Sequence, residues 1–218
     1  MAVGDNACEA SGFSLAAQEN DHVTRLWEFS AGELADLIRT RQASCLEVVD
    51  AHLERIWSVN PRVNALTNVM TDQAREAAQE ADRRTMSGDS LGPLHGIPFT
   101  VKENIDVAGT ATTWGVSALQ DAIADSDAPL VANLRSAGAI PIGRTNMPDF
   151  ALRWHTDNGV HGATVNPWDM TVTPGGSSGG NAAALATGMT PLGMGKMRLA
   201  YLPFQLPCNL GRCLRPCN

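Results

Sequence analysis

The chain has 218 residues and a formal net charge of −7, with 44% hydrophobic and 18% charged residues. These proportions are ordinary for a globular protein of one or two domains, and the acidic balance argues against nucleic-acid binding through a basic surface. Residues 1–20, expected to form a leader, lack the layout of a signal peptide, and no apolar run approaches a membrane span. We therefore expect no nucleic-acid or membrane partner, and a cytoplasmic location, since only Cys8 and Cys45 precede residue 196.

Two capping boxes mark the first helices of the chain. Ser30-x-x-Glu33 and Ser44-x-x-Glu47 each place a hydroxyl and a carboxylate where they can satisfy the first N–H groups of a helix. The second helix is expected to stop at Asn60-Pro61, because proline cannot continue the hydrogen-bond ladder.

Helices and strands alternate through the middle of the chain. The expected elements are a short strand at 65–69, an alanine-rich surface helix at 71–86, a strand within 94–104, a helix at 129–137 and a strand at 139–143. This order predicts an α/β fold with a mixed central sheet flanked by helices, whose functional residues lie on loops at strand ends.

The strand within 94–104 carries a lysine at its end. Ile97, Phe99 and Val101 alternate along it, and Lys102 follows on the opposite face from Val101. A lysine in this place is usually a solvated strand terminus. Glu103, beside it, is expected to be an exposed charge.

Gly175-Gly176-Ser177-Ser178-Gly179-Gly180 is the most informative stretch. Such a loop, leading into the alanine-rich segment 182–186, predicts a helix N-terminus where N–H groups can approach a ligand. A flexible linker would be longer and repetitive. A phosphate-binding loop needs Gly-Lys-Ser/Thr, and the dinucleotide pattern Gly-x-Gly-x-x-Gly has no match here.

Four blocks together resemble the amidase signature family. They are Gly96-Ile97-Pro98-Phe99-Thr100-Val101-Lys102-Glu103-Asn104, Gly143-Arg144-Thr145-Asn146-Met147-Pro148-Asp149-Phe150-Ala151, Asn166-Pro167-Trp168 and Thr173-Pro174-Gly175-Gly176-Ser177-Ser178-Gly179-Gly180. The resemblance runs from about Trp27 to Gly195, in the family's order and spacing.

The resemblance implies a Ser–Ser–Lys hydrolase of carboxamide bonds that needs no cofactor and no metal. Lys102 would be the base and Ser177, which follows a cis peptide in the family, the bridging serine that relays a proton to a nucleophilic serine. Gly175, Gly176 and Ser178 would line the substrate-binding part of the loop. The substrate would be a small-molecule amide, with the A subunits of amidotransferases as one kind of relative; the oligomeric state stays open.

The family's nucleophile lies about two dozen residues beyond the bridging serine, and there the sequence departs from the pattern. The match continues through Thr190–Gly195, but Ser178 is the last serine of the printed sequence. Tyr201 stands near the expected position, and a phenol with an ordinary pKa near 10 is a poor substitute. Two interpretations follow: an amidase that is inactive as written, or a non-catalytic remnant with weak amide binding.

Residues 196–218 also differ in composition. They hold four basic and no acidic residues, and Cys208, Cys213 and Cys217. Our hypothesis is that residues 21–195 are the N-terminal part of an amidase domain and that 196–218 are an aberrant tail produced by a slipped reading frame. A zinc site is disfavoured because the tail has no histidine and its cysteine spacing is unusual. A disulfide scaffold is disfavoured because nothing upstream signals secretion.

Three histidines and one tryptophan are further candidates. His95 is expected to fill a turn. His155 and His161 lie in a loop that, by resemblance, edges the substrate pocket; each is more often structural than a substrate contact. Trp154 is a candidate to line the same pocket, but packing in the core is the expected role.

Overall fold

The computed structural model describes residues 25–195. The predicted leader, Tyr201 and the cysteines of the tail lie outside these residues. The helical elements are η1 Leu26–Glu28, α2 Ala31–Arg39, α3 Cys45–Val63, α4 Thr71–Ser87, η2 Ser117–Leu119, α5 Pro129–Ser136, η3 Asp149–Ala151 and α6 Gly179–Ala186. The strands are β1 Leu66–Val69, β2 Pro98–Lys102, β3 Ile140–Thr145 and β4 Leu192–Met194. Within the described residues, no helix has both the length and the apolar character needed to span a membrane.

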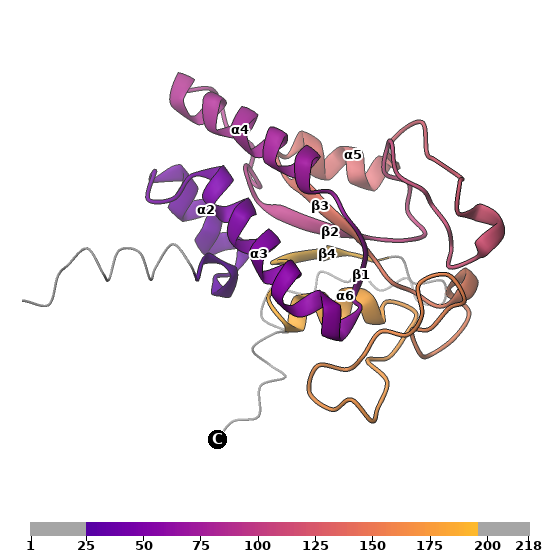
Figure 1. Cartoon of the computed structure of the whole chain (residues 1–218). Coiled ribbons are helices and arrows are strands. Elements are labelled where there is room, and N and C mark those ends of the chain that lie inside the picture. Colours follow the sequence, from indigo (N-terminus) through magenta and orange to yellow (C-terminus); the bar gives the residue numbers. More distant parts are fainter. Residues whose placement is uncertain (1–24, 196–218) are drawn as a thin grey trace, which may run out of the picture.

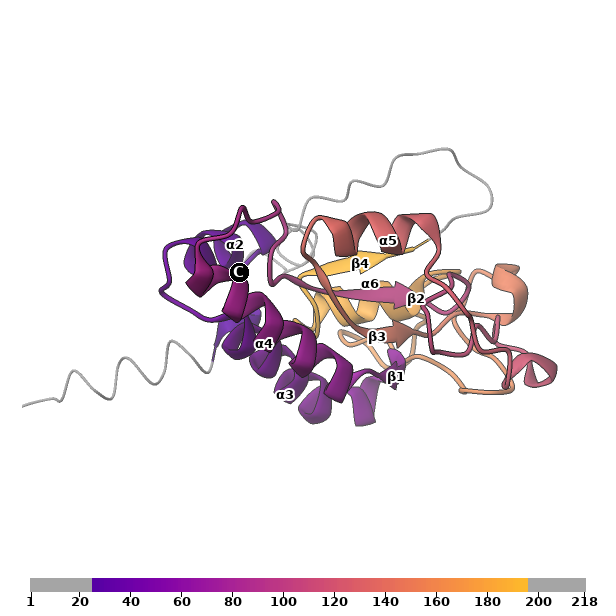
Figure 2. The same cartoon turned by 90° about the horizontal axis from the view of Figure 1, so that it is seen from above.

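The strands form one four-stranded sheet in the order β1-β3-β2-β4 (Figure 2). Strand β2 runs parallel to both β3 and β4, whereas β1 is antiparallel to β3. The predicted mixed sheet is therefore confirmed. Helices α4 and α5 lie on one side of the sheet and α6 on the other, so helices flank both faces (Figure 1).

Strand β2 is buried on both faces, and its alternation separates two environments. Phe99 and Val101 belong to an apolar cluster that includes Val131 of α5. Thr100 and Lys102 face the side of α6, where the hydroxyl of Thr100 donates to the side chain of Asn181 over 3.3 Å. A central strand of this kind needs apolar residues on both faces; the polar residues on one face of β2 thus mark a functional side.

The first helices begin as the capping boxes predict. Ser30 and Ser44 each accept a hydrogen bond from the backbone of the glutamate three residues later, and both glutamate side chains bond back to the cap. Helix α3 then packs against α4, whose buried residues Ala74, Ala78 and Ala81 are small enough to allow close approach.

The predicted stop of α3 at Asn60-Pro61 is wrong. The helix continues to Val63, which is buried together with Val59 one turn earlier. A proline in the last turn removes only one backbone bond, and burial of Val63 favours the extra turn. The Asn60 side chain then fixes the exit, because its Oδ1 accepts from the backbone N–H groups of Ala65 and Leu66 over 2.9 and 2.8 Å.

The connections after β2 and β3 are long and irregular. They gather beyond the ends of these strands, on the side of the molecule away from α2 (Figures 1 and 2). The glycine loop that precedes α6 reaches the same region (Figure 1).

Candidate active site

Lys102 ends strand β2 with a completely buried side chain. The prediction of a solvated strand terminus, which its position alone would favour, does not apply. Burial lowers the pKa of the Lys102 amine from 10.5 to about 8, because the charged form loses its hydration. A substantial fraction of this amine is therefore neutral at slightly alkaline pH, and a neutral amine can accept a proton.

The two adjacent serines of the glycine loop both reach this lysine. The Nζ of Lys102 donates to the Oγ of Ser177 over 2.8 Å and to the Oγ of Ser178 over 2.9 Å. The peptide bond between Gly176 and Ser177 is cis. The structure thus brings the predicted base and the predicted bridging serine together, although they lie 75 residues apart in the sequence.

Glycine is required at specific positions of this loop by close backbone approaches. A Cβ on Gly176 would lie 2.7 Å from the carbonyl oxygen of Arg153, and one on Gly180 would lie 2.5 Å from the backbone nitrogen of Asn146. Gly175 adopts a φ of +88°, which favours glycine. The backbone geometry therefore explains why glycine occupies these three positions, whether or not they contact a substrate.

Asn181, in the first turn of α6, joins the serine loop to the sheet. Its Oδ1 accepts from the hydroxyl of Thr145 on β3 over 2.8 Å, and its Nδ2 donates to the carbonyl of Met194 on β4 over 2.7 Å. Together with the contact to Thr100, one buried side chain bonds to three neighbouring strands. Asn181 was not among the predicted site residues. The signal that could have identified it is a single amide side chain at the start of an otherwise alanine-rich helix.

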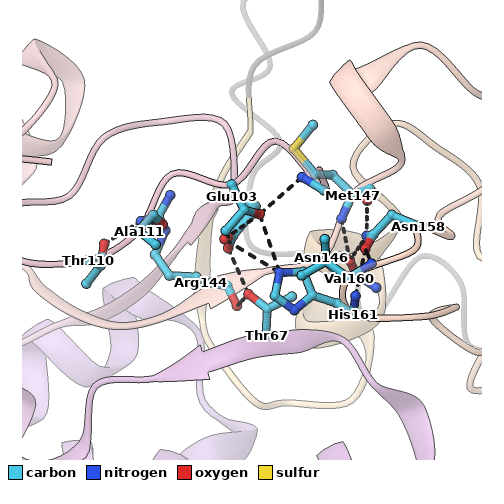
Figure 3. Close-up of polar contacts among 12 residues, drawn as sticks. Thr67, Glu103, Thr110, Ala111, Arg144, Asn146, Met147, Asn158, Val160 and His161 are labelled. Atoms are coloured by element: carbon cyan, nitrogen blue, oxygen red, sulfur yellow. Dashed lines mark hydrogen bonds and ion pairs between the residues drawn. The ribbon is translucent and has the colours of Figure 1, made fainter. Parts of the chain in front are cut away.

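The prediction of an exposed Glu103 is wrong. Its side chain is buried, and its carboxylate accepts from the hydroxyl of Thr67 over 2.8 Å (Figure 3). It also accepts from the hydroxyl of Thr113 over 3.1 Å. The Nε2 of His161 lies 3.8 Å from the same carboxylate. Because the strand ends at Lys102, residue 103 turns into the polar cluster beyond the sheet, where hydroxyls replace the water that a carboxylate otherwise needs.

The remaining candidates divide between packing and surface. His95 is buried, and its Nε2 lies 3.0 Å from the hydroxyl of Thr85 and 3.1 Å from the carbonyl oxygen of Ala81, in agreement with a structural role. His155 is exposed. The prediction that Trp154 packs in the core is wrong, because its side chain is 78% exposed.

This arrangement can perform proton transfer between an amine and a hydroxyl in a water-poor site. Its parts are a buried lysine with a lowered pKa, a serine at hydrogen-bond distance and a loop fixed to the sheet. Within residues 25–195, no group of three or more His, Cys, Asp or Glu side chains could hold a metal ion.

A family model described as Amidase matches residues 47–196. Among curated proteins, the chain is 45% identical over 191 residues to an indoleacetamide hydrolase of Bradyrhizobium diazoefficiens, covering 88% of this chain and 36% of that protein. It is 44% identical over 173 residues to the A subunit of the glutamyl-tRNA(Gln) amidotransferase of Salinispora tropica, covering 79% of this chain and 35% of that protein. The chain thus spans about a third of the length of these relatives.

Solved structures give the same comparison in three dimensions. A bacterial aryl acylamidase that belongs to the amidase signature enzymes superposes with a TM-score of 0.71 at 34% identity. The superposition covers 74% of this chain and 34% of that protein. The described sheet and its helices therefore correspond to part of a larger fold.

Proposed function

The chain belongs to the amidase family, and from that premise we propose that it carries the base-and-relay half of a serine-dependent carboxamide hydrolase. One observation supports this most directly: the Nζ of a completely buried Lys102 lies 2.8 Å from the Oγ of Ser177. In the proposed site Lys102 is the base and Ser177 the bridge. Ser178, Gly175 and Gly176 line the substrate side of the loop.

The proposed reaction moves one proton along this pair in each direction. Neutral Lys102 accepts the Ser177 proton while Ser177 accepts a proton from an attacking hydroxyl, whose oxygen then forms a bond to the carbonyl carbon of the amide. Collapse of the tetrahedral intermediate breaks the C–N bond, and the proton on Lys102 returns through Ser177 to the leaving nitrogen. Water then hydrolyses the resulting ester by the same route, and the products are a carboxylic acid and ammonia or an amine.

The attacking hydroxyl is the part that the printed sequence does not supply. No serine follows Ser178, so we propose that this polypeptide, as written, does not complete the reaction. The alternative is a non-catalytic remnant that binds amides weakly, and the same missing serine favours it. Under both interpretations the proposed ligand is a small carboxamide, as the names of the indoleacetamide hydrolase and the aryl acylamidase suggest for those proteins.

A cytoplasmic location remains our proposal.

A chimera tests whether the lysine and serine of this chain can serve catalysis. Residues 1–195 would be fused to the part of the indoleacetamide hydrolase that follows the matched region, and ammonia release from indoleacetamide would be measured. We expect turnover in the chimera and none in the unfused chain. Lys102→Ala and Ser177→Ala should each reduce the turnover of the chimera by about 10³-fold or more, because a nucleophile without its base is inert.

Two outcomes would contradict the proposal. Turnover in the chimera that survives both Lys102→Ala and Ser177→Ala would remove the proposed proton relay. Ammonia release by the unfused chain, if abolished by Lys102→Ala, would show that the polypeptide is active as written and contains an attacking group that we have not identified.

A further inference from the structure

Residues 156–164 contact both the glycine loop that carries Ser177 and Glu103, which follows Lys102 at the end of β2. We propose that this segment, here called the clasp, sets the distance between Lys102 and Ser177, and that Thr156 is the positioning residue at its serine end. The inference deepens the proposed function, since it takes the Lys102–Ser177 pair as the working pair. The experiment below separates the failure of one from the failure of the other.

At the serine end, one hydroxyl closes the glycine loop. The Oγ1 of buried Thr156 donates to the carbonyl of Gly175 over 2.9 Å and accepts from the backbone N–H of Gly179 over 3.0 Å. Gly175 and Gly179 stand on either side of Ser177 and Ser178. A side chain that accepts and donates at once is needed here, because the two backbone groups are of opposite kind. Thr156 thereby fixes both ends of the segment that carries the serines.

At the lysine end, the clasp meets the residue that follows Lys102. His161 Nε2 lies 3.8 Å from Oε1 of Glu103 (Figure 3). The same nitrogen lies 3.4 Å from the hydroxyl of Thr113. Glu103 is itself held to β3, because its backbone N–H donates to the carbonyl of Thr145 over 3.1 Å. A shift of the clasp at this end would therefore act on the end of β2 and on the Lys102 side chain.

Internal bonds make the clasp a stiff connection. The backbone N–H of Thr164 donates to the carbonyl of Thr156 over 2.9 Å, so that the segment closes on itself. The Oδ1 of Asn158 accepts from the N–H of His161 over 2.7 Å, and its Nδ2 donates to the Oδ1 of Asn146 over 2.7 Å (Figure 3). Buried polar groups that are all paired in this way resist displacement. A stiff segment that is fixed at both ends would hold the distance between Lys102 and Ser177 constant.

The test places a thiol at position 177 and measures its chemistry with Lys102. In a Ser177→Cys variant of the full chain, the rate of alkylation of the introduced thiol by iodoacetamide is followed from pH 6 to 9 by mass spectrometry of the peptide containing position 177. A neighbouring lysine ammonium lowers the pKa of a thiol and increases its thiolate fraction. The rate relative to the same protein with Lys102→Met therefore measures the coupling between positions 102 and 177.

We expect a rate ratio of roughly tenfold at pH 7 with Thr156 in place, the effect of lowering a thiol pKa by about one unit. Thr156→Ser, which keeps the hydroxyl, should preserve this ratio to within about twofold. Thr156→Val, which keeps the shape and removes both hydrogen bonds, should reduce it to below about threefold. Alkylation of buried Cys45 in the same samples reports any global opening, since that thiol is fully covered in the fold and burial raises its pKa to about 12.

His161→Leu removes the contact between the clasp and Glu103 at the lysine end. If Thr156→Val does not fold, the same rate ratio is measured in His161→Leu instead. An unchanged ratio in a folded Thr156→Val, or in a folded His161→Leu if Thr156→Val does not fold, overturns the inference. A ratio of one with Thr156 present overturns it as well, because the two positions would then not be coupled. A coupled pair that depends on Thr156, found beside a chimera without turnover, would support the clasp while the proposed function fails.

Discussion

At the scale of single residues, Lys102 determines the chemistry of the site and is also a cost to stability. A buried ammonium loses its hydration, and hydrogen bonds such as those to the hydroxyls of Ser177 and Ser178 offset this loss only in part. The pKa of about 8 expresses this balance. Because the fold solvates the charged form of Lys102 poorly, this side chain can accept a proton at near-neutral pH.

The pKa of Lys102 can be measured directly, because the chain has only two lysines, Lys102 and Lys196. In protein labelled with ¹³Cε-lysine, the variant Lys196→Arg leaves a single signal. We expect this signal to titrate near pH 8. A midpoint above pH 10, the range of an exposed lysine, would show that the amine is not buried as described and would contradict its role as a base.

Replacement of Lys102 by methionine should stabilise the protein at neutral pH. The unfolded lysine binds its proton up to about pH 10.5 and the folded one only up to about pH 8, so the stability of the native chain is lowest below pH 8 and rises between these values. Each pKa unit is worth about 1.4 kcal/mol and each lost hydrogen bond costs about 1 kcal/mol, which leaves a net gain for Lys102→Met of about 1–2 kcal/mol at pH 7.

Urea unfolding at pH 7 and pH 10 checks this expectation. The advantage of Lys102→Met should shrink or disappear at pH 10, where the native lysine is neutral. Lys196→Arg is the matched control for removal of a lysine, and its effect should not follow the same pH dependence. A loss of stability in Lys102→Met at pH 7 would contradict the argument.

Single residues also show where the sequence was a poor guide. Lys102 and Ser177 could be paired only through the resemblance, since no local pattern connects positions 75 residues apart. Glu103 was misjudged because a charge at a strand end is normally solvated, whereas here Thr67 and Thr113 provide hydroxyls from other parts of the chain. Burial of a charge depends on its partners, and partners are a property of the tertiary structure.

At the scale of elements, α3 contains a second buried titratable group. His52 is completely buried, and its Nδ1 lies 2.8 Å from the carbonyl oxygen of Val48, while within the described residues its Nε2 has no hydrogen-bond partner. Burial lowers the pKa of His52 from 6.5 to about 4. Protonation of this ring would place a charge in the buried surroundings of α3.

The stability of the fold should therefore decrease in acid through His52. The unfolded histidine binds a proton below about pH 6.5 and the folded one only below about pH 4, so its contribution is complete above pH 6.5 and is lost as the pH falls towards 4. The shift corresponds to about 3 kcal/mol at most. Urea unfolding between pH 4 and 7 should show a shallower decline in His52→Leu than in the native chain, and exposed His155→Gln is the control. Parallel curves for all three proteins would contradict the assignment.

The hydrogen bonds of Asn181 at the start of α6 should also contribute to the stability of the fold. Asn181→Ala leaves the hydroxyl of Thr145 and the carbonyl of Met194 without the partner that they have in the native protein. We expect a loss of about 2–4 kcal/mol in urea unfolding, since each buried polar group left unpaired costs about 1–3 kcal/mol. Asn166→Ala, at a half-buried amide whose hydrogen bonds to the backbone of Thr173 and Trp168 are solvent-exposed, is the matched control and should change the stability by less than about 1 kcal/mol. Equal effects of the two variants would exclude a special role for Asn181.

Elements with local signals were predictable and those with tertiary causes were not. The capping boxes at Ser30 and Ser44 act within a few residues, and the sequence shows them. The end of α3 depends on the burial of Val63, which overrides the local effect of Pro61. Propensity decides an element boundary only where packing is neutral.

At the scale of the whole molecule, the order of strands is the feature that sequence reasoning could not reach. The alternation of helices and strands predicted a mixed sheet, but not that β3 lies between β1 and β2, nor that β4 pairs with β2. That order places the end of β2 next to the loop before α6, and the site follows from it. Within the described residues, the buried apolar side chains form two clusters, and the sheet contributes to both of them.

Removal of residues 196–218 provides the last prediction. These residues lie outside the part of the chain that the structure describes, and our hypothesis assigns them to an aberrant tail. If so, a chain that ends at Gly195 should melt within about 2 °C of the full chain, because no part of the described core is removed. Under the same hypothesis, in which residues 196–218 take no part in the site, its Lys102 signal should also titrate at the same pH, with the hydroxyls of Ser177 and Ser178 retained.

Differential scanning calorimetry and the lysine titration together decide the matter. A fall of more than about 5 °C, which for a unit of this size corresponds to more than about 1 kcal/mol, would show that the last residues stabilise the fold and would contradict the assignment. An unchanged melting temperature with a shifted Lys102 titration would also contradict it, since residues 196–218 would then contribute to the environment of the amine. Agreement of both measurements would locate everything that Lys102 requires within the first 195 residues.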